Sequence, residues 1–341
     1  MSTSVERTDR KILYIITALL LILIAVPSCS KETGLTTRSR TYFDYFDTVS
    51  SIYSYAGDSK EHFEDTASTV EGMLKKYHRL LDIYNEYEGM NNLCTLNRNA
   101  GIQPVELDPF LLEYLQTAKE YYTLTDGEMN IMMGSVLSIW HNCRENGFLP
   151  TPEELKKASE HTSIDSLVID LEKGTAFITD SLASTDAGAM GKGFAAEKIA
   201  GQLENGYVVD IGGNIRLIGT KANGENWFTG IKNPSDDSKI AVRLSLSDTS
   251  CVTSGNYERY VEIDGKRYSH IIDKDTLMPA DYYLSVSVIT RDSGLADALA
   301  TALSCMSIEK GLGIVGRLED VQVLWILPDM SMVTTEGFEA L

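Results

Sequence analysis

The apolar residues of this chain recur at two spacings, and each spacing predicts a kind of secondary structure. Recurrence every three to four residues predicts a helix over 61–84. It predicts a second helix that opens with Asp108 as N-cap and Pro109 in the first turn, and stops at Asp126-Gly127. Shorter helices are expected over 135–141, 150–158 with Thr151 as N-cap, 192–200 and 296–306.

Alternating or short continuous apolar runs predict strands. They cover 41–56, 167–170, 175–179, 207–211, 215–219, 227–231, 240–246, 257–263, 266–272, 284–289 and 321–327, the last of which closes the sheet. Lys173-Gly174 and Asp264-Gly265 are hairpin turn signals. This order of elements predicts an α+β fold, a mainly antiparallel sheet with packed helices. No internal repeat and no linker follows residue 40, so we expect a single domain over 41–341.

The N-terminal segment has the pattern of a targeting sequence. Arg7, Arg10 and Lys11 precede an apolar run of fifteen residues, 12–26. That is shorter than the ~20 residues of a spanning helix and matches a signal peptide over 1–28. The run ends in Val-Pro-Ser-Cys, which resembles a bacterial lipobox with Cys29 as the lipidated residue.

An uncleaved membrane anchor is the alternative to a cleaved signal peptide, and both place the domain outside the cytoplasmic membrane. Residues 29–40 then form the lipidated cysteine and a polar tether. We therefore expect a protein of the cell membrane, lipid-anchored on its extracytoplasmic face.

Composition and net charge exclude some classes of function. The chain of 341 residues is 43% hydrophobic and carries a formal net charge of −19. It is therefore expected to fold and not to bind nucleic acid through a basic surface. A polyanionic ligand would need a local lysine or a metal ion. Besides Cys29 there are four cysteines, Cys94, Cys143, Cys251 and Cys305. Their spacing fits neither a CxxC pair nor a zinc site, so they are expected to be buried free thiols.

The segment 184–200 carries the first candidate chemistry. Asp186, Gly188, Gly191 and Lys192 stand at a turn directly before a helical run. Glycines before a helix let backbone N–H groups approach an anion, and the helix N-terminus favours negative charge. The spacing fits neither GxxxxGK[ST] nor GxGxxG. A tight structural turn therefore remains an equal alternative on spacing alone.

Three further groups carry candidate chemistry, each with a plainer alternative. Asp297 and Thr301 are four apart on a helix and offer hard oxygen ligands suited to magnesium, or form an ordinary exposed face. Ser254, Gly255 and Tyr257 stand at an expected strand start, or in an ordinary turn. His270 and Asp273 are expected on the strand that returns from Asp264-Gly265, where a histidine is often only packed.

Six motifs in order make the chain resemble one family, the ApbE family of FAD:protein FMN transferases, often flavin-trafficking lipoproteins. DAGAMGKGFAAEKIA is similar to the family's D-x-G-x-x-x-K-G-Y/F-A stretch, and VVDIGGNIRLIG resembles its N-x-G-G-D/N-I-R-x-x-G turn. GIKNP, TSGNYERY, DGKRYSHIID and ADALATAL follow in the family's order. The resemblance covers roughly Phe43 to Leu327 and implies a T-fold-like catalytic domain.

The resemblance implies a reaction: with Mg²⁺, FMN passes from FAD to a threonine hydroxyl of an acceptor protein (protein flavinylation), and AMP is released. It implies Ala189, Asp297 and Thr301 as magnesium ligands, with Asp297 also catalytic. His270 matches the family's histidine and is expected to act as general base. The residues implied to contact FAD are Asp126, Gly127, Asp186, Gly188, Lys192, Gly212, Gly213, Ser254, Gly255 and Asp273.

Two segments depart from the family pattern. Asn130 and Met132 stand where G-x-F-D-x-T has its acidic residue and threonine, and HIIDKDTLMP lacks a proline and a glycine of the usual H-I-I-D-P-x-T-G-x-P. Two other functions remain open: a magnesium-dependent FAD pyrophosphatase giving FMN and AMP, and a non-enzymatic FAD-binding and delivery lipoprotein. For the transferase, a membrane redox subunit is the expected acceptor.

Overall fold

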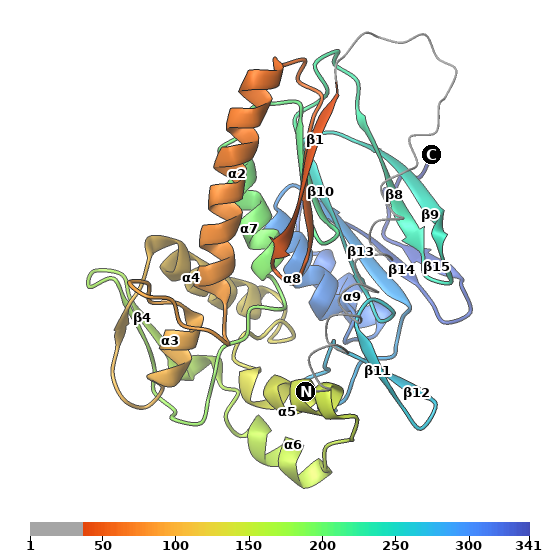
Figure 1. Cartoon of the computed structure of the whole chain (residues 1–341). Coiled ribbons are helices and arrows are strands. Elements are labelled where there is room, and N and C mark those ends of the chain that lie inside the picture. The colour runs from red at the N-terminus through yellow and green to blue at the C-terminus, as the bar shows by residue number, and fades with distance from the viewer. Residues whose placement is uncertain (1–36) are drawn as a thin grey trace, which may run out of the picture.

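An eight-stranded antiparallel sheet runs through the part of the chain that the computed structural model describes, residues 37–341 (Figure 1). Its strand order is β1-β2-β6-β7-β10-β13-β14-β15. The strands are β1 (Arg38–Tyr45), β2 (Thr48–Ser54), β6 (Tyr207–Ile211), β7 (Asn214–Ile218), β10 (Thr249–Gly255), β13 (Ser285–Thr290), β14 (Gln322–Ile326) and β15 (Met332–Thr334). The pairs β1–β2, β6–β7 and β14–β15 are hairpins, and longer connections join the other neighbouring strands, which also pair antiparallel.

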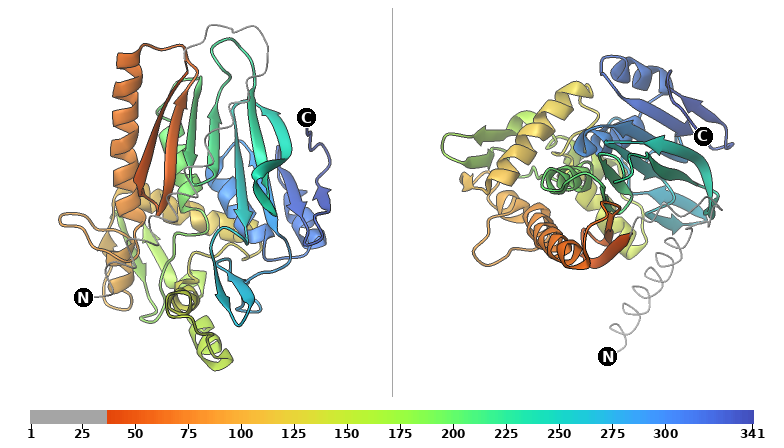
Figure 2. Two further views of the ribbon diagram at one scale, coloured as in Figure 1. Left: turned by 45° about the vertical axis from the view of Figure 1, so that its right-hand side comes forward. Right: turned by 90° about the horizontal axis from the view of Figure 1, so that it is seen from above.

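Helices cover one face of this sheet and a separate hairpin covers the other (Figures 1 and 2). The helical layer contains α2 (Lys60–Leu81), α7 (Gly191–Ala200), α8 (Ser293–Leu303) and α9 (Ile308–Val315). The opposite cover is the hairpin of β8 (Trp227–Asn233) and β9 (Asp236–Leu246). In β10, Val252 packs in the helical core while its neighbour Cys251 packs under β8 and β9. Strand β10 is therefore covered on both faces, and β13 is buried along its whole length.

The remaining elements lie at one end of the sheet (Figure 1). They are α3 (Leu93–Arg98), α4 (Pro109–Leu124), α5 (Gly134–Asn146) and α6 (Pro152–Ser159), the small sheet β3 (Val105–Glu106), β5 (Thr175–Ile178) and β4 (Leu167–Asp170), a 3₁₀ turn Ile164–Ser166, and the hairpin β11 (Tyr260–Ile263) with β12 (Lys266–Ser269). This arrangement confirms the predicted α+β class and the mainly antiparallel sheet.

Several local predictions are confirmed with their physical reasons. The Asp108 carboxylate accepts a hydrogen bond from the Phe110 N–H at 2.9 Å and caps α4. Thr151 caps α6 in a capping box with Glu154. The strands β4 and β5 pair around Lys173-Gly174 as expected. The four cysteines within the described residues are buried and free: Cys94, Cys143, Cys251 and Cys305.

Other local predictions are wrong. The single strand expected over 41–56 is the hairpin of β1 and β2, whose turn places Phe46 and Asp47 at positive φ. Ser254 and Gly255 lie at the end of the unpredicted strand β10, not at a strand start. His270 and Asp273 lie beyond β12, which ends at Ser269, because the chain turns away there.

Three expected boundaries also move. β15 lies outside β14, so the predicted strand over 321–327 does not close the sheet. The strand β11 begins at Tyr260 and not at 257. The strand β1 begins at Arg38, within the segment expected to be a tether.

The predicted signal segment 1–28, Cys29 and the tether as far as residue 36 lie outside the described residues. None of the helices in residues 37–341 combines the length and apolar character needed to cross a membrane.

Candidate active site

Close packing of α7 on α8 forms the centre of the candidate site. A side-chain Cβ at Gly193 would lie 2.2 Å from the Ser293 carbonyl oxygen and 2.5 Å from the Asp297 Cβ, so only glycine fits there. The Gly193 N–H, in the first turn of α7, donates to Asp297 Oδ2 at 2.8 Å. The helix N-terminus and the carboxylate are thus joined directly, an arrangement that its dipole favours.

The contact between α7 and α8 also brings Lys192 close to the residues expected to bind magnesium. Lys192 Nζ lies 3.8 Å from Asp297 Oδ1, and the Asp297 residue is only 3% exposed. Burial raises the pKa of Asp297, while the Lys192 charge and the Gly193 N–H oppose that rise. Thr301 Oγ1 donates to the Ala189 carbonyl oxygen at 3.2 Å. We call Ala189, Lys192, Asp297 and Thr301 the α7–α8 centre.

The turn before α7 connects this centre to the segment that leads into α5. The Asp186 N–H donates to the Ile131 carbonyl at 2.7 Å, and Asp186 Oδ1 accepts from the Gly188 N–H at 2.7 Å. Burial raises the pKa of Asp186, and the Gly188 N–H and the charges of Arg144, His141 and Lys192 oppose it. Asp186 therefore faces cations from two different helices.

The turn between β6 and β7 contains two glycines, and the structure favours glycine at each position for a different reason. Gly212 has φ +58° and leaves no room for a Cβ beside Thr48, whereas Gly213 has φ +88° and open space around it. The Gly213 N–H donates to Asp210 Oδ1 at 2.8 Å. Burial raises the pKa of Asp210 to about 6, against the Gly213 N–H and the Lys232 charge. The sequence analysis did not single out Asp210 or Lys232.

His270 directly follows β12 and is held by the backbone of the residue just before β11, Arg259. Its N–H donates to the Arg259 carbonyl oxygen at 3.0 Å, and its ring Nδ1 lies 3.2 Å from the same oxygen. Burial, followed by the positive charges of Arg259, Lys192 and Arg144, lowers the pKa of His270 to about 4. The ring is therefore neutral at neutral pH, and Nδ1 carries its proton because a carbonyl oxygen only accepts.

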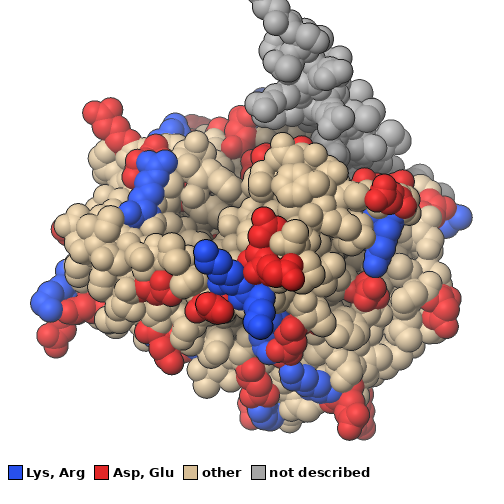
Figure 3. Space-filling model, turned by 90° about the horizontal axis from the view of Figure 1, so that it is seen from below, with Lys and Arg blue, Asp and Glu red and all other residues tan. Residues whose placement is uncertain are grey.

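Three cations thus act on one region: Lys192 from α7, Arg144 from α5 and Arg259 from the segment before β11. On the face seen from below, Lys and Arg are interspersed with Asp and Glu (Figure 3). Arg259 belongs to a motif that the sequence analysis quoted, but Arg144 belongs to none. The sequence therefore offered no signal for Arg144.

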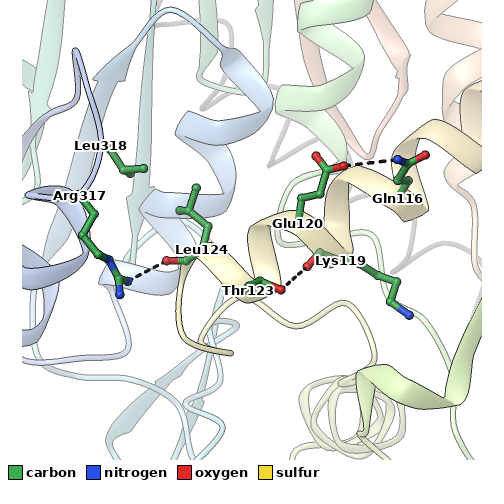
Figure 4. A pocket seen from close by; sticks show the side chains of 7 residues that line it. All are labelled: Gln116, Lys119, Glu120, Thr123, Leu124, Arg317 and Leu318. Atoms are coloured by element: carbon green, nitrogen blue, oxygen red, sulfur yellow. Dashed lines mark hydrogen bonds between the residues drawn. The ribbon is translucent and has the colours of Figure 1, made fainter.

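The predicted FAD contacts Asp126 and Gly127 are not joined to the α7–α8 centre by any contact among the described residues. Asp126 forms an exposed ion pair with Arg317 at 3.0 Å, and the Gly127 N–H donates to the Tyr122 carbonyl. Arg317 also donates to the Leu124 carbonyl and lines a cavity of about 720 Å³ against α4 (Figure 4). That cavity therefore lies beside Asp126, and none of the residues of the α7–α8 centre lines it.

Asp273 is buried beside a second cavity. Its Oδ1 accepts from the N–H groups of Asp275 and Thr276 at 2.7 and 3.1 Å, and its Oδ2 accepts from the Tyr282 hydroxyl at 3.2 Å. The cavity, about 660 Å³, is lined by β12 and the loop after it, and Ser269, the neighbour of His270, is part of its wall. Asp273 thus shapes a loop next to the histidine.

The residues that depart from the family pattern have structural partners. Asn130 donates to the Thr162 carbonyl at 2.8 Å and accepts from the Met132 N–H at 2.9 Å, and the Met132 side chain is fully buried. Lys274, in place of the family's proline, lies 3.3 Å from Glu128 and 2.6 Å from Asp275. Both segments are therefore held by local contacts.

Residues 37–341 hold no group of three or more His, Cys, Asp and Glu side chains able to bind a metal ion. The predicted magnesium set contains one carboxylate, one hydroxyl and one carbonyl, so this finding does not bear on it.

Solved structures show the same architecture. The ApbE protein of Thermotoga maritima superposes with a TM-score of 0.80 at 25% identity, over 89% of this chain and 98% of that one. The flavin transferase ApbE of Vibrio cholerae superposes with a TM-score of 0.74 at 25% identity, over 88% of this chain and 97% of that one. The fold is thus that of flavin transferases.

The sequence comparisons agree. The family model described as "ApbE family" matches residues 46–325. A protein of Treponema pallidum named FAD:protein FMN transferase is 34% identical, over 72% of this chain and 73% of its own length. One of Klebsiella pneumoniae with the same name is 28% identical, over 80% of this chain and 85% of its own. The chain belongs to the ApbE family.

Proposed function

We propose that this protein is an FAD:protein FMN transferase that uses Mg²⁺ to transfer FMN to a threonine of an acceptor protein and releases AMP. Its relatives carry the name of that enzyme, and the α7–α8 centre supplies the chemistry. The single observation that carries the finer proposal is the convergence of Lys192, Asp297, Thr301 and Ala189 across two helices.

The donor set fits a magnesium ion. Asp297 Oδ1 has no hydrogen bond among the described residues and only Lys192 at 3.8 Å. Thr301 Oγ1 and the Ala189 carbonyl oxygen lie 3.2 Å apart. Neighbouring ligands of an octahedral Mg²⁺ are about 3 Å apart, given its metal–oxygen distance of about 2.1 Å. These three groups would hold the ion, which supplies charge neutralisation at the pyrophosphate.

His270 has the protonation state that a general base requires. Its Nδ1 donates toward the Arg259 carbonyl, so Nε2 has the free lone pair. In the proposed step, Nε2 takes the threonine hydroxyl proton while the threonine oxygen bonds to the phosphorus of the FMN half. The bond between that phosphorus and the bridging oxygen breaks, and AMP leaves with the electron pair. Lys192 lies near the oxygens that gain charge.

The decisive experiment uses the soluble domain from about residue 31, FAD, Mg²⁺ and an acceptor-domain peptide with the target threonine. AMP release and peptide mass are followed together. We expect AMP together with a peptide mass gain equal to FMN. AMP with free FMN and an unmodified peptide would support the pyrophosphatase instead. FAD retained without AMP would support the carrier.

Asp297→Asn tests the metal in the same assay. It keeps an oxygen for the Gly193 N–H but removes the charge that would hold Mg²⁺. We expect a loss of at least about 10²–10³-fold in the Mg²⁺-dependent rate, with an unchanged circular dichroism spectrum. Equal wild-type activity in chelator and in Mg²⁺ would refute the metal proposal.

We infer further that the protein is lipid-anchored at Cys29 on the extracytoplasmic face of the membrane, where it modifies a membrane redox subunit. The lipobox-like Val-Pro-Ser-Cys supports this. Cys29→Ala should leave the full chain out of the detergent-phase lipoprotein fraction. A variant that partitions like wild type would argue against lipidation.

A further inference from the structure

Arg144 is a partly buried cation that the mechanism above does not use. It lies in the last turn of α5, and its Nη1 is buried without a hydrogen-bond partner among the described residues. Burial lowers the pKa of the Arg144 guanidinium, partly offset by the carboxylate of Asp186. An unpaired donor on a buried charged group is costly. Its retention indicates that a ligand supplies the acceptor.

The packing of α5 directs Arg144 toward the proposed base. Trp140 stacks on Tyr268 of β12 with ring centroids 6.1 Å apart, and its indole N–H donates to the Leu277 carbonyl at 2.8 Å. Arg144 is four residues after Trp140, about 6 Å along the same side of the helix. His270 is two residues after Tyr268, just past the end of β12. Arg144 and His270 therefore both lie within a few residues of the Trp140–Tyr268 contact, and the charge of Arg144 acts on His270.

The surrounding charges favour an anion. Arg144, Lys192 and Arg259 all act on His270, which is neutral, and on the carboxylate side only Asp186 is shared by Arg144 and Lys192. The residues that the structure describes include no ion pair of Arg144 within 4 Å. The carboxylates of Asp186, Glu258 and Asp297 offset part of these positive charges. The buried Nη1 of Arg144 remains a donor that a phosphate oxygen can satisfy.

We propose that Arg144 binds a phosphate oxygen of the flavin nucleotide, beside the phosphorus that the acceptor hydroxyl attacks. The proposal rests on the function proposed above. A planar guanidinium with a free N–H fits two phosphate oxygens at once, and it stays charged throughout the reaction. Arg144 is thus an additional binding residue on α5, outside the α7–α8 centre and outside every quoted motif.

The test measures FAD affinity by flavin fluorescence for wild type, Arg144→Gln and Arg144→Lys. We expect Arg144→Gln to bind FAD about tenfold to a hundredfold more weakly, as for the loss of one charged hydrogen bond. Arg144→Lys should recover part of that affinity, since it restores the charge but not the fork. Arg40→Gln is the matched control: Arg40 pairs with Glu64 on β1 and α2, and its affinity should equal wild type.

Riboflavin, which lacks phosphate, is used as a competitor of FAD. Its inhibition constant should be the same for wild type and Arg144→Gln. A loss for riboflavin equal to that for FAD would overturn the proposal in favour of a packing role. An FAD affinity of Arg144→Gln within twofold of wild type would also overturn it, and slower transfer at that affinity would assign Arg144 to the acceptor.

The outcome is separable from the proposed function. A wild-type protein that binds FAD but never modifies an acceptor would defeat the transferase proposal. The comparison of FAD affinities would still decide the role of Arg144.

Discussion

The α7–α8 centre and the β11–β12 hairpin hold the two halves of the candidate site by different means. In the first, Gly193 lets two buried helices approach until the backbone of one donates to a carboxylate of the other. In the second, two strands of four residues each form a separate small sheet, and half of their eight residues are exposed. Tyr268 of this hairpin packs in an apolar cluster with Trp140 and Val136 of α5, and Trp140 also donates to the loop after the hairpin.

The difference shows where geometry is rigid and where it is adjustable. The proposed metal ligands lie on buried helices, where interiors are close-packed and small shifts are costly. The proposed base lies just past a two-stranded sheet that is separate from the main sheet, so fewer strand pairings fix its position. An enzyme that must admit a protein segment can keep its metal half fixed and let its other half adapt.

Gly193→Val should have the largest effect. Its side chain would collide with the Ser293 carbonyl and the Asp297 Cβ, which are not free to move. We expect a loss of about 3 kcal/mol or more in the free energy of unfolding, at the upper end for overpacking, together with loss of transfer. Urea unfolding measures the first. The control is Gly313→Ala in α9, where a Cβ has open space and stability should be equal or slightly higher. A Gly193→Val protein as stable as wild type would refute the tight-packing argument.

Trp140→Phe should have a smaller effect, which lowers stability and the transfer rate but leaves the Mg²⁺ requirement unchanged. The ring still stacks near Tyr268, but the Leu277 carbonyl loses its hydrogen bond. We expect a loss of about 1–2 kcal/mol in stability. The transfer rate should fall several-fold, whereas the Mg²⁺ concentration for half-maximal activity should stay unchanged. A shift in that Mg²⁺ requirement would mean that the two halves are not independent.

The smallest effect concerns pH. Since the pKa of His270 is about 4, the rate should be flat from about pH 6 to 8, without the inflection near ~6.5 of an ordinary histidine. Arg259→Gln removes the largest opposing charge, so the pKa of His270 should rise and the acid limb move to higher pH. A pH–rate profile of both proteins checks this. An inflection near 6.5 in wild type would contradict the low pKa.

The free energy of unfolding should also depend on pH through the protonation of His270. The folded state binds the His270 proton more weakly than the unfolded chain, whose pKa is about 6.5. Its contribution to stability is therefore fully present above about 6.5 and is lost as the pH falls toward about 4.

Local patterns predicted what local physics decides. Asp297 and Thr301 share a helix face because they are four apart, and Asp108 and Thr151 cap helices because their side chains accept from the next turn. The β1–β2 turn was missed because Phe46 and Asp47 adopt positive φ without a glycine or proline to signal it. The strand β10 was missed because its last residues, Thr253 to Gly255, have the composition of a turn.

Local sequence patterns could not predict contacts between residues that are far apart in the chain. The family resemblance brought Ala189 and Asp297 to one ion, but no local pattern indicates that a Cβ at Gly193 would collide with Ser293, because that contact depends on how two helices pack. The placement of Arg144 depends on Trp140 meeting Tyr268 from a distant strand. The motifs marked the proposed metal ligands, and the three-dimensional packing added the cations around the histidine.

The reactivity of the four buried cysteines, Cys94, Cys143, Cys251 and Cys305, can report local unfolding of this protein. Burial raises the pKa of Cys251 to about 12, so its thiolate, the species that reacts with alkylating reagents, is scarce while the fold is closed. Cys94, Cys143 and Cys305 are buried in other parts of the fold: α3, α5 and the end of α8. The order in which iodoacetamide labels them would therefore map which part opens first, with no engineered probe.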